Sequence, residues 1–159
     1  MTATRQLMAL AVSLVICLGA AGIGSILTMP SIGTWYAALH KPQWNPPNWI
    51  FGPVWTFLYC CMAVAAWLVW RQGGFTAARV PLLLFAVQLA LNVIWSGIFF
   101  RLRSPGAAFA EVVLLWILIL ATTIAFRPVS LTAAWLMAPY LAWVTFATVL
   151  NATIWRMNA

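Results

Sequence analysis

Charged side chains are scarce in this sequence, and acidic ones are nearly absent. Only 6% of its 159 residues are charged, and Glu111 is the single Asp or Glu. Soluble domains carry about 25% charged residues, so this chain has too little polar surface to face water over most of its length. One acid also excludes any chemistry that needs a pair of carboxylates.

Patterns that bind metals or phosphates are missing as well. His40 is the only histidine, and no cysteine or acid stands near it at metal-ligand spacing. Cys17, Cys60 and Cys61 lie in apolar runs and suggest no disulfide framework, so we expect them to pack as small apolar residues. No phosphate-binding loop and no Ser–His–acid set occurs. The sequence therefore predicts no metal site, no required cofactor and no primary pump, and leaves His40 open as an axial haem ligand.

The chain is instead rich in long hydrophobic runs. Its residues are 65% hydrophobic, and the mean hydropathy is +1.01. A helix needs about 20 apolar residues to cross a bilayer, and five runs satisfy this: residues 7–28, 49–70, 80–100, 106–126 and 131–155. The first run exceeds the apolar core of a signal peptide. We therefore predict one all-α domain over residues 1–159, a multi-pass integral membrane protein with a bundle of five transmembrane helices.

The eight basic residues stand singly near the ends of these runs. Lipid headgroups lie at that level, so the pattern favours membrane anchoring over nucleic-acid binding. Five crossings divide the basic residues between two sides of the membrane. One side collects Arg5, Arg71, Arg79 and Arg127, and the other collects Lys41, Arg101, Arg103 and Arg156. This tie leaves the orientation open.

The connection from Met29 to Asn48 is the only long one, and it leads into the stretch KPQWNPPNW at 41–49. Structureless connections of this length are uncommon and often functional. Prolines fix the backbone dihedral φ and hold the stretch extended, and tryptophan is favoured at membrane interfaces. We interpret the stretch as a rigid aromatic lid over one mouth of the bundle. The alternative is an interfacial anchor, which fits Trp49.

Polar and aromatic side chains share faces of three spans at helical spacing. These faces carry Trp55 and Tyr59; Gln88, Asn92, Trp95 and Phe99; and Tyr140, Trp143, Ala147, Leu150 and Asn151. Amides, a phenol and indoles around an apolar space suit a large flat ligand with a few polar edges. In the other interpretation, the amides hydrogen-bond across the bundle and hold its helices together. The two roles are compatible.

Glu111 lies about two turns into the fourth span, where a charge is costly and often functional. Two interpretations stay open. Glu111 forms an ion pair with Arg101 or Arg103 near the interface, or it binds a proton or a ligand.

Small residues recur along the first span, among them Gly19, Ala21, Gly22 and Ser25. Small residues let helix backbones approach closely in lipid. The partner is either another helix of this chain or a second copy. We expect these four residues to form a homodimer interface.

Three segments resemble a known family of membrane proteins. They are WYAALHKPQWNPPNWIFGPVW at 35–55, VQLALNVIW at 87–95 and PYLAWVTFATVLNATIWR at 139–156. Together with five spans and 11 tryptophans, they resemble the translocator protein and tryptophan-rich sensory protein family (TspO/MBR) from about residue 35 to 158. The resemblance implies a five-helix bundle, a homodimer, and a first loop folded over a cavity between the helices.

The resemblance also implies a function and a site. Members of the family bind porphyrins such as protoporphyrin IX and haem, cholesterol in animals, and benzodiazepine-site ligands. By position, the cavity is lined by Trp55, Gln88, Asn92, Trp95, Trp143, Ala147 and Leu150, with Tyr140 on the same face, and covered by Trp44, Pro46 and Pro47. We expect a tetrapyrrole receptor or carrier that transports its ligand or signals stress, with Arg or Lys at the mouth meeting the propionates. The alternatives are a light-dependent porphyrin-degrading enzyme that uses Trp55 and Trp143, a sterol-binding translocator, and a ligand-free regulatory partner.

Two positions depart from the animal members of that family. Ala152 stands where the sterol motif has a tyrosine, and Ala107 stands where a ligand-contacting tryptophan begins the fourth span. The sterol motif is weak even when intact. These departures favour a porphyrin over cholesterol, leave benzodiazepine-type binding open, and lean toward a bacterial envelope membrane rather than the mitochondrial outer membrane.

Overall fold

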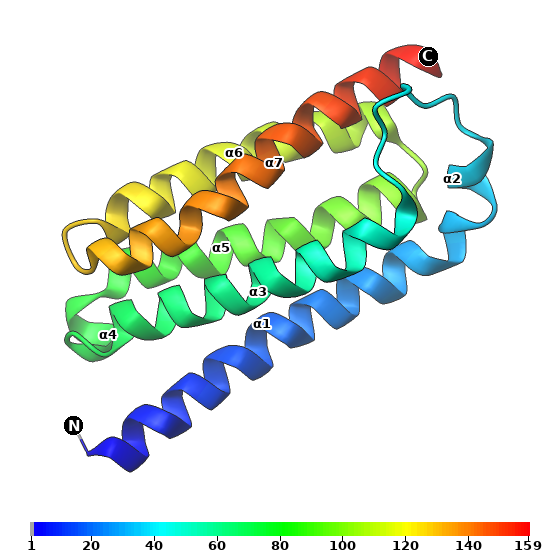
Figure 1. The fold of residues 1–159 in the computed structure, drawn as a ribbon. Helices are drawn as coiled ribbons and strands as arrows, with labels where there is room; N and C mark the ends of the chain where they lie inside the picture. The colour runs from blue at the N-terminus through cyan, green and yellow to red at the C-terminus, as the bar shows by residue number, and fades with distance from the viewer. Residues whose placement is uncertain (1) are drawn as a thin grey trace.

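Five long helices dominate the computed structural model, which describes residues 2–159 (Figure 1). They are α1 (Ala3–Ile32), α3 (Asn48–Trp70), α5 (Arg79–Ser96), α6 (Pro105–Phe126) and α7 (Leu131–Met157). Two single-turn helices, α2 (Trp35–Ala38) and α4 (Gly74–Ala77), lie in the connections, and a π-helical segment, η1 (Gly97–Arg101), continues α5. Each long helix, with α5 and η1 taken together, is long and apolar enough to span a membrane. The expected all-α, multi-pass membrane fold is confirmed.

The long helices form a closed ring. Around it, α1 packs against α3, α3 against α7, α7 against α6, α6 against α5, and α5 against α1. Figure 1 shows α6 and α7 as one layer, α3 and α5 beside them, and α1 along the outer edge. Large apolar side chains on the outside, such as Val15, Ile26 and Ile124, are more than half exposed, as a surface in contact with lipid requires.

Packing is tight in the half of the ring that lies toward α4. Met62, Ile119, Phe126 and Met137 are fully buried there, and the rings of Phe85 and Phe126 stack at 6.0 Å between centroids. The other half, toward α2, encloses the space described below. The packed half therefore supports the helices whose other ends form the site.

The helix ends follow local chemistry. Ser130 caps α7, because its hydroxyl accepts a hydrogen bond from the Ala133 backbone N–H at 3.2 Å. Pro105 occupies the first turn of α6, where its missing N–H costs nothing.

The first connection differs from the structureless loop that the sequence suggested. Helix α1 continues through Pro30 to Ile32, and α2 follows after two residues. The side-chain nitrogen of Lys41 folds back on α2 and donates hydrogen bonds to the backbone oxygens of Tyr36 and Leu39 at 2.6 and 3.0 Å. These oxygens lie at the end of a helix, where intrahelical partners run out. Lys41 thus organises a segment that hydropathy alone leaves undefined.

Candidate binding cavity

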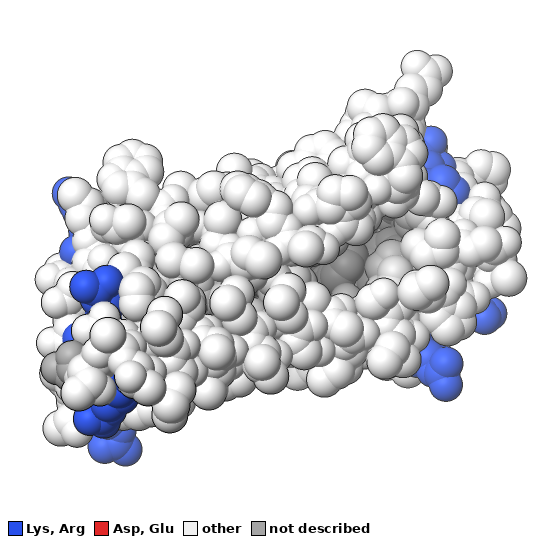
Figure 2. Space-filling model, turned by 60° about the horizontal axis from the view of Figure 1, so that its bottom comes forward, with Lys and Arg blue, Asp and Glu red and all other residues white. Residues whose placement is uncertain are grey.

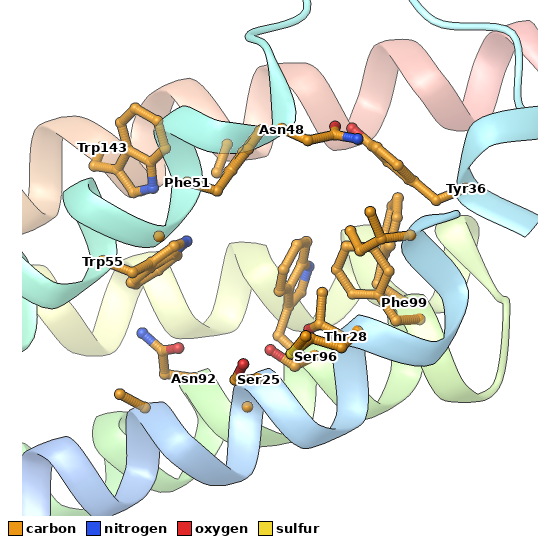
Figure 3. A pocket seen from close by; sticks show the side chains of 18 of the residues that line it. Ser25, Thr28, Tyr36, Asn48, Phe51, Trp55, Asn92, Ser96, Phe99 and Trp143 are labelled. Carbon is orange, nitrogen blue, oxygen red and sulfur yellow. The ribbon is translucent and has the colours of Figure 1, made fainter. Parts of the chain in front are cut away.

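A cavity of about 360 Å³ occupies the half of the ring beside the first connection (Figure 3). Its walls come from α1, α2, α3, α5, η1 and α7. Helix α6 supplies none of the lining residues and supports α5 and α7 from behind. The volume falls in the usual range of small-molecule pockets, roughly 300–1,000 Å³.

Aromatic rings form most of the wall opposite α1. Phe51 and Trp55 come from α3, Trp95 from α5, Phe99 from η1 and Trp143 from α7. The rings hold one another: Phe51 meets Trp143 edge-on at 5.9 Å, and Trp95 stacks on Phe99 at 5.2 Å. Such contacts fix ring orientations before any ligand arrives.

Small polar groups gather on the α1 side. Figure 3 shows Ser25 and Thr28 of α1 near Ser96 of α5, across the cavity from Trp55 and Trp143. Three hydroxyls thus face a wall of rings. This division suits a ligand that is apolar over its flat faces and polar at an edge.

A hydrogen-bonded network forms the floor of the cavity. The Tyr59 hydroxyl donates to Asn92 Oδ1 at 3.0 Å, Asn92 Nδ2 donates to the Tyr140 hydroxyl at 2.6 Å, and that hydroxyl donates to Gln88 Oε1 at 2.8 Å. Gln88 and Tyr140 are completely buried and do not line the cavity, whereas Tyr59 and Asn92 do. Gln88 therefore joins helices, and Asn92 does so while also facing the cavity, so ligand binding by the amides stays a prediction.

The two cavity indoles on α5 and α7 differ in their N–H groups. Trp95 donates its N–H to Asn151 Oδ1 at 3.1 Å, and Asn151 in turn donates to the Pro105 backbone oxygen at 2.8 Å. Trp143 has a buried indole N–H with no partner among residues 2–159. Trp95 is thus held in place by the fold, and Trp143 offers an unused donor at the cavity.

The expected lid residues lie beside the cavity rather than in its wall. Trp44, Pro46 and Pro47 are not among the lining residues, although the Trp44 ring meets Phe146 edge-on at 5.8 Å. Tyr36 of α2 supplies the lid's contact with the cavity. Sequence reasoning missed Tyr36 as a site residue. Its place in a connection rich in proline and tryptophan was the signal that could have identified it.

The lid is tied down at several points. The Tyr36 hydroxyl donates to Asn45 Oδ1 at 3.1 Å, and the Lys41 nitrogen lies 4.8 Å from the centre of the Tyr36 ring. Burial raises the pKa of Tyr36 above its ordinary value, so the hydroxyl keeps its proton and remains a donor at neutral pH. The Asn158 side chain at the end of α7 accepts from the His40 backbone N–H at 3.0 Å and donates to the His40 backbone oxygen at 2.8 Å.

The cavity opens sideways between α1 and α3. Lining residues on both helices are exposed at this seam: Ser25 and Met29 on α1, and Gly52 and Thr56 on α3. Figure 2 shows the surface hollowed toward the end that carries the first connection. Because the seam lies between two membrane spans, the opening faces lipid.

The small residues of α1 separate into two groups. Ala21 and Ser25 line the cavity, and Ser13 on the same side donates its hydroxyl to the Ala63 backbone oxygen at 2.7 Å. Gly19 and Gly22 are exposed, and a Cβ atom at either position would meet nothing within 4 Å. Ala21 and Ser25 therefore border the cavity, and the homodimer interface expected at Gly19, Ala21, Gly22 and Ser25 stays a prediction.

Comparison with known proteins finds a matching family and relatives over most of the chain. The TspO/MBR family model matches residues 11–156. The chain is 42% identical over 158 residues to the tryptophan-rich protein TspO of Chlorobaculum tepidum, covering 97% of this chain and 98% of the relative. It is 50% identical over 126 residues to the translocator protein of Homo sapiens, covering 78% and 75%. It is 41% identical over 124 residues to a tryptophan-rich sensory protein of Cereibacter sphaeroides, covering 78% and 77%.

Proposed function

The chain belongs to the TspO/MBR family, and from that premise we propose that it is a membrane receptor or carrier that binds tetrapyrroles such as protoporphyrin IX or haem in its cavity. The observation that carries the proposal is the aromatic-walled cavity that opens to lipid between α1 and α3. A ligand of this class is flat, largely apolar and soluble in the bilayer. The names of relatives, such as translocator and sensory protein, are in keeping with binding and transfer.

Ring stacking supplies the main attraction. Trp55, Trp95 and Trp143 come from three helices and face one space, so a macrocycle can stack on one indole and meet the edges of the others. The free N–H of Trp143 and the hydroxyls of Ser25 and Ser96 then meet polar edges of the ligand.

The sequence suggested that an Arg or Lys at the mouth of the cavity would pair with the propionates of the ligand. The cavity wall does not supply such a cation. No Arg or Lys is among the lining residues within 2–159, and Lys41 is engaged by backbone oxygens of α2. The carboxylates of a bound tetrapyrrole would instead point toward the end of the cavity beside the first connection, where the spans end at the membrane surface. There they stay hydrated, which avoids the cost of a buried, unpaired charge.

The test is a titration of the purified chain with protoporphyrin IX in nanodiscs, followed by porphyrin absorption. Trp95→Phe combined with Trp143→Phe is expected to weaken saturable binding roughly tenfold, because two stacking contacts of about 0.5–1.5 kcal/mol each are reduced. Trp135→Phe is the matched control, since Trp135 lies on the outside of α7 and is 70% exposed. Equal affinity in all three proteins would reject this cavity as the site.

Light-dependent porphyrin degradation is a second candidate function. Figure 3 shows Trp55 and Trp143 near one another at one end of the cavity, where an excited macrocycle would lie beside two oxidisable indoles. The same titration run in light and in the dark separates the two functions. A new porphyrin product formed only in light, and lost in Trp55→Phe and Trp143→Phe, would establish the enzyme. Saturable binding without a light-dependent product would favour the receptor or carrier function.

Saturable binding of a sterol but not of a porphyrin would favour a sterol translocator. Absence of saturable binding for both would favour a ligand-free regulatory partner.

A further inference from the structure

Two arginines at the end of the bundle opposite the cavity lie against tryptophan rings. The guanidinium carbon of Arg71 is 4.9 Å from the centre of the Trp67 ring, and that of Arg5 is 5.9 Å from the Trp70 ring. Trp67 and Trp70 are three residues apart, so they are neighbours on one side of α3. Both rings are partly buried, and both arginines are exposed.

Helix α1 is fastened to α3 at this same place. The Trp67 indole N–H donates to the Gln6 backbone oxygen at 3.0 Å, one residue from Arg5. One indole therefore carries a guanidinium on its face and ties the first turns of α1 to the end of α3. Arg5 lies in the first turns of α1 and Arg71 directly follows α3, so the two arginines come from the two sides of the α1–α3 seam.

These guanidinium groups have little acid within the chain to pair with. Glu111 is the only acidic side chain, and it lies in α6, whose main packing partners are α5 and α7. The carboxyl terminus lies at the opposite end of the bundle (Figure 1). A guanidinium that stacks on a ring by its face keeps its N–H edge free, and that edge matches phosphate oxygens.

We propose that Arg5 and Arg71, held by Trp70 and Trp67, form a site for the phosphate of an anionic phospholipid at the α1–α3 seam. The site lies where the spans end, at the level of headgroups, and Figure 2 shows basic side chains at both ends of the molecule with none between. An anionic lipid fits better than a zwitterionic one, because the single acidic side chain of the sequence, Glu111, lies in α6 and is not at this end to pair with a headgroup ammonium. The proposal is independent of the ligand in the cavity.

Occupancy has a mechanical consequence. Along the seam, the Trp67–Gln6 and Ser13–Ala63 hydrogen bonds lie toward the arginine end, and the cavity opening lies toward the other. A phosphate that bridges Arg5 and Arg71 holds α1 against α3 at the closed end. Helix α1 is one wall of the cavity, so the lipid fixes the base from which that wall extends.

The experiment compares the full chain in nanodiscs of phosphatidylcholine alone with nanodiscs of about four parts phosphatidylcholine to one part phosphatidylglycerol. Retained phosphatidylglycerol is counted by native mass spectrometry after release, and the unfolding temperature is measured in parallel. Arg5→Gln with Arg71→Gln is expected to lower retention several-fold and to abolish the rise in unfolding temperature that phosphatidylglycerol gives the wild type. Arg79→Gln with Arg127→Gln removes the same charge from the same end. This control is expected to keep both the retention of phosphatidylglycerol and the rise in unfolding temperature.

Equal losses in the two double variants would overturn the proposal, because net charge alone would explain them. Glycerol phosphate added to phosphatidylcholine nanodiscs at constant ionic strength is expected to leave the unfolding temperature unchanged. A rise equal to that with phosphatidylglycerol would instead assign the site to a soluble phosphate. If the glutamine variant fails to fold, Arg5→Lys with Arg71→Lys keeps the charge and removes the planar fork. Retention equal to that of wild type in this variant would also overturn the proposal.

Discussion

The carboxyl group of Glu111 lies in α6 with both oxygens shielded from solvent. Neither oxygen has a hydrogen-bond partner among the described residues, so the structure does not form the bond to Arg101 or Arg103 that the sequence allowed. Polar groups inside a membrane protein are costly without partners and persist where they have a function. Glu111 and the Trp143 indole N–H are thus the buried side-chain groups without a hydrogen-bond partner among residues 2–159.

Replacing Glu111 by leucine is expected to stabilise the protein. The change removes a buried polar group without a partner, a gain of about 1 kcal/mol, which corresponds to a rise of roughly 2–4 °C in unfolding temperature for a chain of this size. Thermal unfolding in nanodiscs measures it, with Val113→Leu on the lipid-facing side of α6 as control. A lower unfolding temperature for Glu111→Leu would mean that the carboxyl group has a stabilising partner in the membrane. Higher stability with weaker porphyrin binding would assign Glu111 to the function.

At the scale of elements, the end of α7 and the first connection depend on each other. Asn158 bonds to both backbone groups of His40 and also donates to the Ile154 backbone oxygen at 2.8 Å, so one side chain joins the last turn of α7 to the lid. Trp44 on Phe146 adds a second contact between the same elements. The lid is therefore held from α7 as well as from η1, where Tyr36 meets the rings of Phe99 and Phe100.

Asn158→Ala is expected to loosen the lid without unfolding the bundle. The loss of bonds worth about 1 kcal/mol each should raise hydrogen exchange of backbone amides in residues 35–45 by roughly tenfold and speed porphyrin dissociation. Hydrogen–deuterium exchange with mass spectrometry measures the first effect without a ligand. Thr153→Ala is the control, because the Thr153 hydroxyl bonds within α7, to the Val149 backbone oxygen. Unchanged exchange in residues 35–45 of Asn158→Ala would show that the lid is held by other contacts.

Helical period and hydropathy were sufficient to predict the five spans and several faces of the cavity. Trp55, Asn92, Trp95, Trp143, Ala147 and Leu150 all line it, as their spacing and the family resemblance indicated. These positions follow from the sequence because a side chain's direction along a helix is fixed by its number. Whether they bind a ligand stays a prediction.

The contributions of α1, α2 and η1 could not be predicted in the same way. Ser25 and Ala21 read as helix-packing residues, and only the order of helices around the ring places them at the cavity. The helical turn at Trp35–Ala38 is organised by Lys41, a side-chain contact that local propensity does not encode. The π-helix at Gly97–Arg101 differs from an α-helix by one residue in its hydrogen bonds, and its apolar residues carry no signal for that shift.

At the scale of the whole molecule, the ring has two unlike ends. One half is filled by side chains such as Met62 and Phe126, and the other holds the cavity and its lid. The basic residues do not follow this asymmetry, since four mark each end. Shape therefore distinguishes the two membrane faces, whereas the charge that guides insertion does not.

The even distribution of charge predicts a chain whose orientation is easily changed. Cytoplasmic loops of membrane proteins carry an excess of Lys and Arg, so a tie gives little bias. Arg101→Gln with Arg103→Gln leaves four basic residues at the α4 end against two at the end that carries the carboxyl terminus, and we expect that terminus outside the cytoplasm. Arg79→Gln with Arg127→Gln reverses the counts and should place the carboxyl terminus inside the cytoplasm.

Alkaline phosphatase and green fluorescent protein fused after Ala159 report the two outcomes in bacterial cells, because the first is active only outside the cytoplasm and the second fluoresces only inside. If the wild type gives signals from both reporters and the two double variants shift that balance in opposite directions, these charges set the orientation. The same signal in all three proteins would mean that the first span or the lid sets it.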